Sequence, residues 1–357
     1  MSAVKKLKFE PTPEQKEATV SAINVLDYDL ATAIRSRELI LNERDLRFLV
    51  DCFYQVQEDR KRVDNQARSK EGLEPGKLAE YFGWQFGRFE KQITHALAAW
   101  VDGDPLSTWA TSQVGVGTVI AAGLRAHIDL KRCPTVGHIW SFAGLDGTKK
   151  QFGAVWAKDT VAEVVGKSKS VNAEHWAALE KVSRRKASNI LGLLERVYPG
   201  EKVTRTNLTK TLARCPYNAQ LKTLCWKLGD CFVKVSNKPE ARYGKFYQVR
   251  KAFEFERNER GVNRELALTL AEKVGKSTEA YKHNMEGKLS PGHIDARARR
   301  WAVKLFLAHW FEEGCRLVRG HEPPNPYPIQ HLGHIHWVKS EGTTVEAEGG
   351  LSCERTA

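Results

Sequence analysis

Residues 113–121 are the part of this chain whose residue types and spacing are best suited to bind a ligand. Their sequence is Gln-Val-Gly-Val-Gly-Thr-Val-Ile-Ala, which places Gly115 and Gly117 two positions apart. Glycine tolerates positive φ angles and close backbone approach, so this spacing predicts a tight turn that leads directly into a helix. The first amide groups of a helix lack partners inside it and attract anions. The stretch therefore predicts an anion site built from backbone N–H groups.

The anion that suits such a turn is a phosphate of a nucleic acid, with DNA as the first partner to test. Two helices joined by a turn of this kind form a helix-hairpin-helix, which contacts the phosphate backbone and does not read the bases. The residues expected to contact phosphate here are Gly115, Val116, Gly117, Thr118, Lys131 and Arg132.

The excess positive charge of the chain is concentrated in one segment. The 357 residues contain 56 Lys and Arg and 43 Asp and Glu, a formal net charge of +13. Between Lys181 and Lys251 there are 17 basic and 4 acidic residues, whereas the other 286 residues hold 39 of each. A local basic block is typical of nucleic-acid-binding proteins, although basic helices also occur as plain solvated faces. The cations expected to contact nucleic acid here are Arg184, Arg185, Lys186, Lys222 and Lys245.

Aromatic residues alternate with cations in the second half of this block. On helices, such alternation usually gives one apolar face in the core and one charged face in solvent. Stacking of bases on exposed rings is the functional alternative. We expect the rings to be core residues, namely Trp226, Phe232, Tyr243, Phe246, Tyr247 and Phe253.

A histidine cluster near the C-terminus has a spacing at which imidazoles can converge on Zn²⁺. No C-x-x-C pair accompanies it, so we favour a packed loop and expect no metal. The cluster consists of His321, His331, His334 and His336.

The stretch Gly166-Lys167-Ser168 resembles the end of a phosphate-binding loop of nucleotide hydrolases. That motif requires a further glycine five positions before Gly166, and the residue there is Val161. The comparison excludes nucleotide hydrolysis, and we expect no cofactor.

The cysteines and the N-terminal sequence predict a reduced, cytoplasmic protein. Seven scattered cysteines without a C-x-x-C pair are not a disulfide framework. Charged sequence follows Met1 directly, so we expect no signal peptide and no membrane partner. We expect the protein in the cytoplasm, associated with the nucleoid.

The first hundred residues predict long amphipathic helices. Thr12-Pro13-Glu14-Gln15 combines an N-cap, a proline at the first helical position and a capping-box glutamine. A second helix start is expected at residues 42–45 and a third helix at residues 77–101. We expect these helices to form an antiparallel bundle or a coiled-coil arm that supports homo-oligomerisation.

Helical patterns continue through the rest of the chain, so the predicted class is mainly α. Gly103-Asp104-Pro105 breaks the chain before the glycine turn, and one helix is expected from Asn172 to Tyr198. Further helices are expected at residues 206–213, 218–235, 241–260 and 295–316.

Several stretches follow one another in an order typical of a known family. They are the glycine turn (113–124), Cys-Pro-Thr-Val-Gly-His-Ile-Trp-Ser-Phe-Ala-Gly-Leu (133–145), Tyr-Asn-Ala-Gln-Leu-Lys-Thr-Leu-Cys (217–225), and the helical stretches 243–247 and 296–305. In this order they resemble the C-terminal half of bacterial insertion-sequence transposases of the IS-110 / IS-116 / IS-902 family. The resemblance covers residues 106–148 and 206–311.

The resemblance implies a DNA-binding transposase domain with a helix-hairpin-helix, from a family with RNA-guided members. Family enzymes also carry a RuvC-like domain with an acidic site, which has no counterpart here. The family's nucleophilic serine follows the Ala-Gly-Leu motif, whereas Leu145 leads into Asp146-Gly147-Thr148. The nearest serines, Ser168 and Ser170, lie among lysines in an insertion, where a linker is the favoured interpretation. We therefore leave the catalytic residues unassigned.

Together these patterns predict a DNA-binding protein with a role in DNA transposition or recombination. An active recombinase that needs a partner nuclease domain and an assembly protein with a basic interaction face stay open as alternatives. Structured RNA is a second candidate ligand. The expected segments are a helical bundle or coiled-coil region (1–104), a helix-hairpin-helix (105–150), a basic helical insertion (151–205), a helical transposase-like region (206–319), and a Pro/His-rich loop and tail (320–357).

Overall fold

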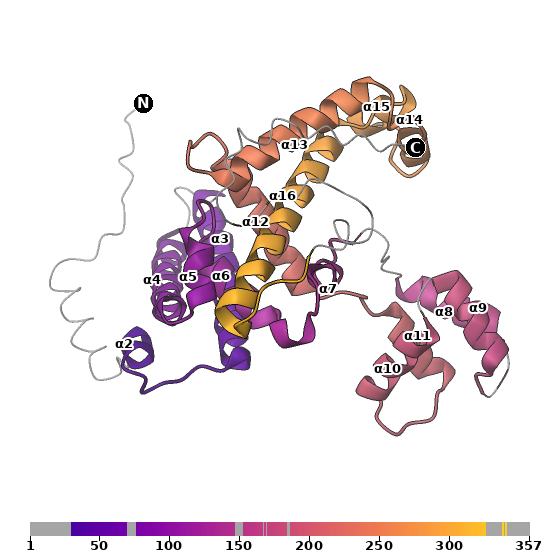
Figure 1. Ribbon diagram of the computed structural model, residues 1–357, viewed down its shortest axis with the longest axis horizontal. Coiled ribbons are helices and arrows are strands. Elements are labelled where there is room, and N and C mark those ends of the chain that lie inside the picture. Colours follow the sequence, from indigo (N-terminus) through magenta and orange to yellow (C-terminus); the bar gives the residue numbers. More distant parts are fainter. Residues whose placement is uncertain are drawn as a thin grey trace. The chain divides into compact units, whose positions relative to one another are not determined.

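The computed structural model describes residues 30–69, 76–146, 153–166, 168, 170–183, 186–325, 338 and 340. These residues form helices joined by turns and contain no strand, which confirms the mainly α class (Figure 1). The chain divides into two compact units: residues 1–139 with 223–357, and residues 140–222. This division does not follow the segment limits at 150 and 205 that composition predicts. The helix expected from Thr12 lies outside the described residues.

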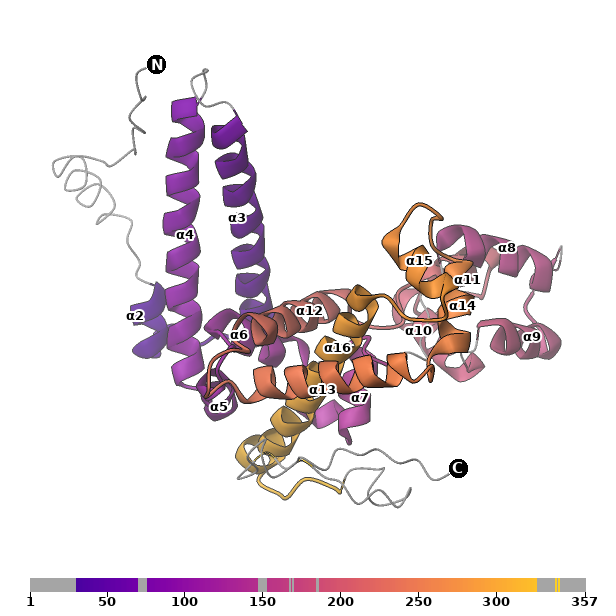
Figure 2. The ribbon, with the colours of Figure 1, turned by 90° about the horizontal axis from the view of Figure 1, so that it is seen from above.

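The first unit begins with an arm of two long antiparallel helices, α3 (Glu43–Ser69) and α4 (Gly76–Asp102) (Figure 2). Asn42 caps α3, because its Oδ1 accepts from the amides of Arg44 and Asp45 at 2.8 and 3.2 Å. The Asp45 carboxylate in turn accepts from the Asn42 amide at 3.0 Å, which completes a capping box. The short helix α2 (Leu30–Arg35) packs against the last turns of α4. The helix starts expected at residue 42 and near residue 77 are therefore confirmed.

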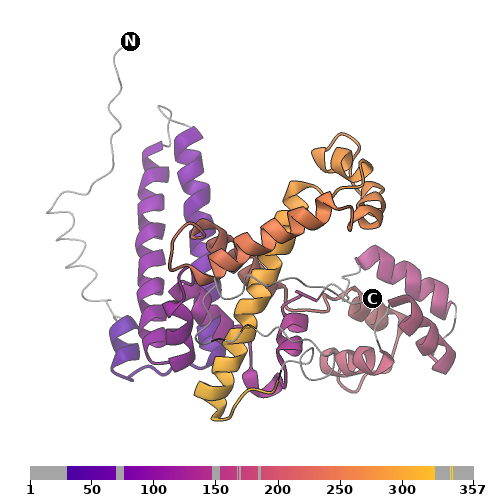
Figure 3. The same cartoon turned by 45° about the horizontal axis from the view of Figure 1, so that its top comes forward.

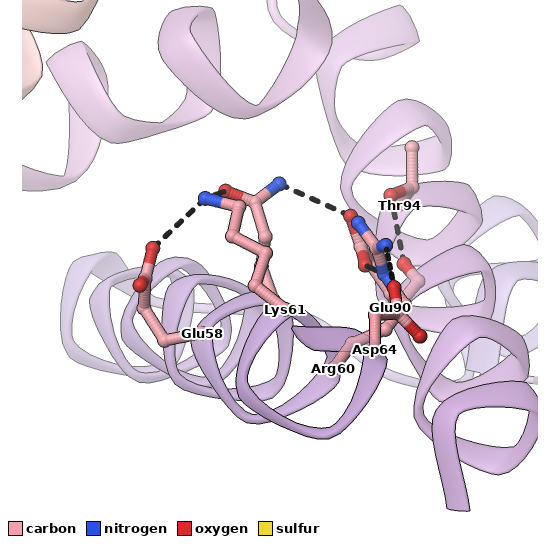
Figure 4. Close-up of polar contacts among 7 residues, drawn as sticks. Glu58, Arg60, Lys61, Asp64, Glu90 and Thr94 are labelled. Atoms are coloured by element: carbon pink, nitrogen blue, oxygen red, sulfur yellow. Dashed lines mark hydrogen bonds and ion pairs between the residues drawn. The ribbon is translucent and has the colours of Figure 1, made fainter. Parts of the chain in front are cut away.

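A polar seam joins α3 to α4 (Figure 4). Glu90 accepts hydrogen bonds from Arg60 at 2.6 Å and from Gln57 at 3.1 Å. Arg60 also pairs with Asp64 at 3.1 Å. A Cβ atom on Gly83 would lie 2.7 Å from Asp64 Oδ1, so the two helices approach closely at this point. The seam adds polar contacts to the apolar packing of the arm, in which α3 buries Val56 and α4 buries Ile93.

The glycine turn lies between two short helices, α5 (Pro105–Ser112) and α6 (Thr118–His127). The 3-10 turn η1 (Leu130–Arg132) and α7 (Val136–Phe142) follow. Helix α6 is buried along most of its length, and Gly123 allows Leu224 to pack against its backbone. Arg47 of α3 caps the end of α6 by donating to the Ala126 carbonyl at 2.6 and 3.2 Å. These contacts fix α6 within the first unit.

An aromatic core holds the C-terminal helices of the first unit together. Helix α13 (Arg242–Glu259) crosses α16 (Pro291–Gly314) (Figure 3), and α12 (Ala219–Lys234) contributes Phe232 to the same core. The rings of Tyr243 and Phe306 meet edge to face at 5.1 Å between centroids. The short helices α14 (Arg264–Ala271) and α15 (Glu279–Met285) and the π-helical turn η2 (Cys315–Arg319) complete the unit.

A buried polar group lies beside this aromatic core. His309 has no exposed surface, and its two ring nitrogens meet the Tyr243 hydroxyl at 2.8 Å and the Val338 carbonyl at 2.9 Å. The carbonyl can only accept, so Nε2 carries the proton and Nδ1 accepts from Tyr243. Burial lowers the pKa of His309 to about 4. The histidine is therefore neutral near pH 7.

The second unit contains four helices, α8 (Ala154–Val165), α9 (Ala173–Ser183), α10 (Ala187–Val197) and α11 (Arg205–Ala213). The prediction of a single helix from Asn172 to Tyr198 is wrong. A straight helix of that length would span about 39 Å, whereas Leu179 of α9 and Ile190 of α10 both pack in one small core. The members of this core are Ala157, Val161, Val165, Leu179, Ile190, Leu194, Leu208 and Leu212.

Candidate nucleic-acid interface

The turn between α5 and α6 has the backbone geometry that its glycines require. Gly115 has a φ of +101°, a conformation that side chains rarely permit. The Val116 amide donates to the Gln113 carbonyl at 2.9 Å and closes the turn. Gly117 is the N-cap of α6, in an extended conformation with no side-chain cap. The glycines thus take the turn directly into the helix start.

Only part of this turn is accessible. A Cβ on Gly115 would meet Val235 at 3.0 Å and Phe232 at 3.3 Å, and the Val116 side chain is buried. Gly117, by contrast, is exposed, and a Cβ there would meet nothing within 4 Å. Within the described part of the chain, no acceptor meets the amides of Thr118 or Val119. Of the four predicted turn residues, Gly117 is exposed and Thr118 is half-buried, whereas Gly115 and Val116 shape the turn.

Asp104 fixes the start of α5 and links it to α6. Its carboxylate accepts from the Ser107 amide at 2.9 Å and the Ser107 hydroxyl at 2.7 Å. It also pairs with Arg125, near the end of α6, at 3.1 Å. Both side chains of the pair are largely buried, at 14% and 18% exposure. The pair therefore holds the two helices that flank the turn.

Replacing Asp104 with alanine is expected to lower the free energy of unfolding by about 2 kcal/mol, about 1 from the lost cap and the rest from the lost ion pair. Asp104→Asn keeps a capping oxygen and is expected to lose only about half of this. Urea denaturation monitored by circular dichroism measures both values. Equal losses in the two variants would show that the cap contributes nothing.

Lys131 and Arg132 are exposed in η1, beyond the end of α6. The ten residues of α6 span about 15 Å. The two cations therefore lie at the opposite end of the helix from Gly117, and the structure does not bring the six predicted residues into one cluster.

The second unit carries much of the positive charge. Its 83 residues contain 15 Lys and Arg and 7 Asp and Glu, a net charge of +8. Lys202, Arg205 and Lys210 are exposed, and none of them forms an ion pair within the described residues. Arg205 and Lys210 lie on α11, which packs into the core through Leu208 and Leu212, whereas Lys202 precedes the helix. We name the three cations the α11 basic face.

Two acidic residues of the second unit bond to backbone amides. Glu195 accepts from the Gly200 amide at 3.2 Å, and Glu180 accepts from the Ala187 amide. Lys186 is exposed at the start of α10 and has no ion pair among the described residues. Arg184 and Arg185 lie outside the described residues. Lys222 is exposed, and its Nζ lies 3.0 Å from the Tyr217 hydroxyl.

Cations of α13 in the first unit serve the fold instead. Glu254, 1% exposed, pairs with Arg250 and with Arg297. Lys251 pairs with Asp295 at 3.1 Å. Lys245 is the α13 cation that the sequence predicts to contact nucleic acid. It is half-buried and forms no ion pair in the described structure.

The prediction that the aromatic residues of the basic block are core residues is wrong at one position of α12. Phe232, Tyr243, Phe246 and Tyr247 are buried, as expected. Trp226 is 64% exposed, so its assignment to the core is wrong. The helix buries the positions Leu221, Leu224, Cys225, Leu228 and Phe232, which follow a spacing of three and four residues. Position 226 falls outside that stripe, a signal that the sequence already contained.

Neither Ser168, which the sequence analysis considered as a nucleophile, nor the Cys225 thiol is activated by a described neighbour. The Ser168 hydroxyl donates to the Ser170 carbonyl at 2.8 Å, and both serines are exposed. Burial raises the pKa of the Cys225 thiol to about 12, which keeps it protonated. His321 is exposed and bonds to the Glu322 carbonyl, whereas His331, His334 and His336 lie outside the described residues. Within the described ranges, no cluster of three potential metal ligands occurs.

No protein-family model, curated protein or solved structure matches this chain. In the parts of the chain that the structure describes, none of the helices combines the length and apolar character needed to cross a bilayer. The function must therefore be argued from the chain's own residues.

Proposed function

We propose that this protein binds the phosphate backbone of nucleic acid, with duplex DNA as its first ligand. The observation that carries the proposal is the α11 basic face, three exposed cations without ion pairs in the described structure. Cations that are already paired lose that interaction when they bind phosphate. Unpaired cations release counterions from the nucleic acid, which drives binding.

The glycine turn adds a second, independent contact to this proposal. The amides of Thr118 and Val119 and the exposed Gly117 suit a phosphate oxygen at the start of α6. Backbone amides and lysines do not distinguish bases, so binding would be largely independent of sequence.

We further propose a role in DNA transposition or recombination, in which the α3–α4 arm joins copies of the chain. This part rests on the motif order that resembles insertion-sequence transposases and on the length of the arm. Incubation with branched DNA and denaturing electrophoresis tests for strand cleavage or a covalent adduct. Their absence with and without a nuclease partner would limit the role to binding.

The turn contact is tested by Gly117→Glu, which fits sterically because nothing lies within 4 Å of the new Cβ. The added carboxylate would occupy the amides and repel phosphate, and we expect binding to a 20-bp duplex to weaken about tenfold at 0.1 M salt, roughly the effect of one phosphate contact. Fluorescence anisotropy measures this change.

Two controls accompany that variant. Gly117→Ala is expected to bind within twofold of wild type. Gly153→Glu introduces the same charge at the N-cap of α8, where a Cβ also meets nothing within 4 Å. If Gly153→Glu weakens binding as much as Gly117→Glu does, overall charge explains the effect and the turn makes no contact.

A further inference from the structure

Trp226 is an unusual residue on the surface of the first unit. It is the only exposed tryptophan among the nine that the structure describes. Tryptophan is highly buried on average, yet 64% of this residue is exposed. No ring contact or hydrogen bond to its indole occurs among the described residues. The flat face of the indole is therefore free to take a ligand.

The surroundings of Trp226 favour an anionic ligand with flat apolar parts. The next residue, Lys227, places its Nζ 3.4 Å from the centroid of the Tyr54 ring on α3. Burial, together with the charge of Lys61, lowers the pKa of Lys227. The carboxylate of Glu58 acts in the opposite direction and raises that pKa.

Acidic groups near this site are already bound. Asp230, one turn beyond Trp226 on α12, pairs with Lys234 at 2.7 Å and with Arg299 at 3.3 Å. Glu58 pairs with Lys61 at 2.9 Å. The α12 residues of the first unit up to Gly229, residues 223–229, include no Asp or Glu. Repulsion of a phosphate is therefore small at the exposed indole.

We propose that Trp226 stacks on an unpaired nucleobase, with Lys227, the next residue of α12, near its phosphates. The inference rests on the proposed nucleic-acid binding and adds the kind of strand that is bound. Inside a duplex both faces of a base are covered by its neighbours, so an indole can stack only on a base in a single strand, a loop or an end. Every base has such a face, so the site would accept any sequence.

The test compares Trp226→Ala and Trp226→Phe with wild type on three fluorescein-labelled probes: a 20-nucleotide oligo-dT, a 20-nucleotide oligo-U and a 20-bp duplex. We expect Trp226→Ala to lose about 5- to 150-fold in affinity for at least one single strand, the range for one stacked base. Trp226→Phe should retain affinity within about threefold, and all variants should bind the duplex within twofold of wild type. The two single strands distinguish DNA from RNA as the source of the base.

Phe89→Ala serves as the matched control, because Phe89 is an aromatic residue of α4 that is 50% exposed. It should leave all three affinities unchanged. Unchanged binding of single strands by Trp226→Ala, with duplex binding intact, overturns this inference and leaves the proposed function standing. Equal losses on all three probes also overturn it, since they indicate a structural role. A wild-type protein that binds none of the probes contradicts the proposed function itself.

Crosslinking supplies a readout that a structural role would not produce. Oligo-U with 5-iodouridine, irradiated with the wild-type protein, should attach to the peptide that contains Trp226. Crosslinks confined to other peptides would contradict the inference.

Discussion

Replacing Lys202, Arg205 and Lys210 together by glutamine is expected to weaken binding of a 20-bp duplex about 500-fold at 0.1 M salt. Each neutralised phosphate contributes about 0.9 to the slope of log affinity against log salt, so three contacts contribute about 2.7. The three side chains are exposed and are not members of the core to which α11 contributes Leu208 and Leu212, so the helix should remain folded. Anisotropy titrations between 50 and 300 mM salt measure both the affinity and the slope.

The matched control removes the same charge from cations that the structure pairs with carboxylates. Arg62, Lys282 and Lys288 again comprise one arginine and two lysines, paired with Asp59, Glu279 and Glu259. Their triple glutamine variant is expected to bind within about fivefold of wild type. If both triple variants lose affinity equally, binding depends on net charge and the α11 basic face has no special role.

Acidification from pH 7 to pH 4 is expected to remove about 3 kcal/mol of stability through His309 alone. Its folded pKa of about 4 lies below the ordinary value of 6.5, because burial disfavours the charged ring. Between these values the unfolded chain binds a proton that the folded protein does not, so stability is present above pH 6.5 and is lost as the pH falls towards 4. A shift of one pKa unit corresponds to about 1.4 kcal/mol.

His309→Gln isolates this contribution, since glutamine keeps polar atoms near Tyr243 and Val338 but does not titrate. The difference in unfolding free energy between wild type and variant should change by about 3 kcal/mol across this pH range. Other groups titrate in both proteins and cancel in the difference. A pH-independent difference for His309→Gln would mean that folding does not lower the pKa of the His309 ring.

Local signals in the sequence were sufficient to predict most helices. Asn42 caps α3 and Asp104 caps α5 through side-chain oxygens close in sequence, so the type of residue and its position define each start. The break between α9 and α10 could not be predicted in this way. It satisfies a tertiary requirement, because Leu179 and Ile190 must reach the same core.

The candidate interface, too, could be predicted from the sequence only in part. The sequence reveals the basic block but does not reveal which of its cations form ion pairs. Lys251 meets Asp295, 44 residues away, whereas Lys202 and Arg205 form no ion pair in the described structure. The exposed position of Trp226 followed from the helical spacing of its neighbours, but alternation of aromatic and basic residues favoured the core. Contacts distant in sequence therefore determine which cations of the basic block remain available.

The salt dependence of wild-type binding to duplex DNA, measured with and without polyglutamate, tests the central claim most directly. The account predicts a slope of log affinity against log salt of about −2.7 or steeper, little dependence on sequence, and displacement by unlabelled DNA but not by polyglutamate at equal charge. A slope near zero, or displacement by polyglutamate as effective as by DNA, would contradict it and favour an acidic protein as the partner.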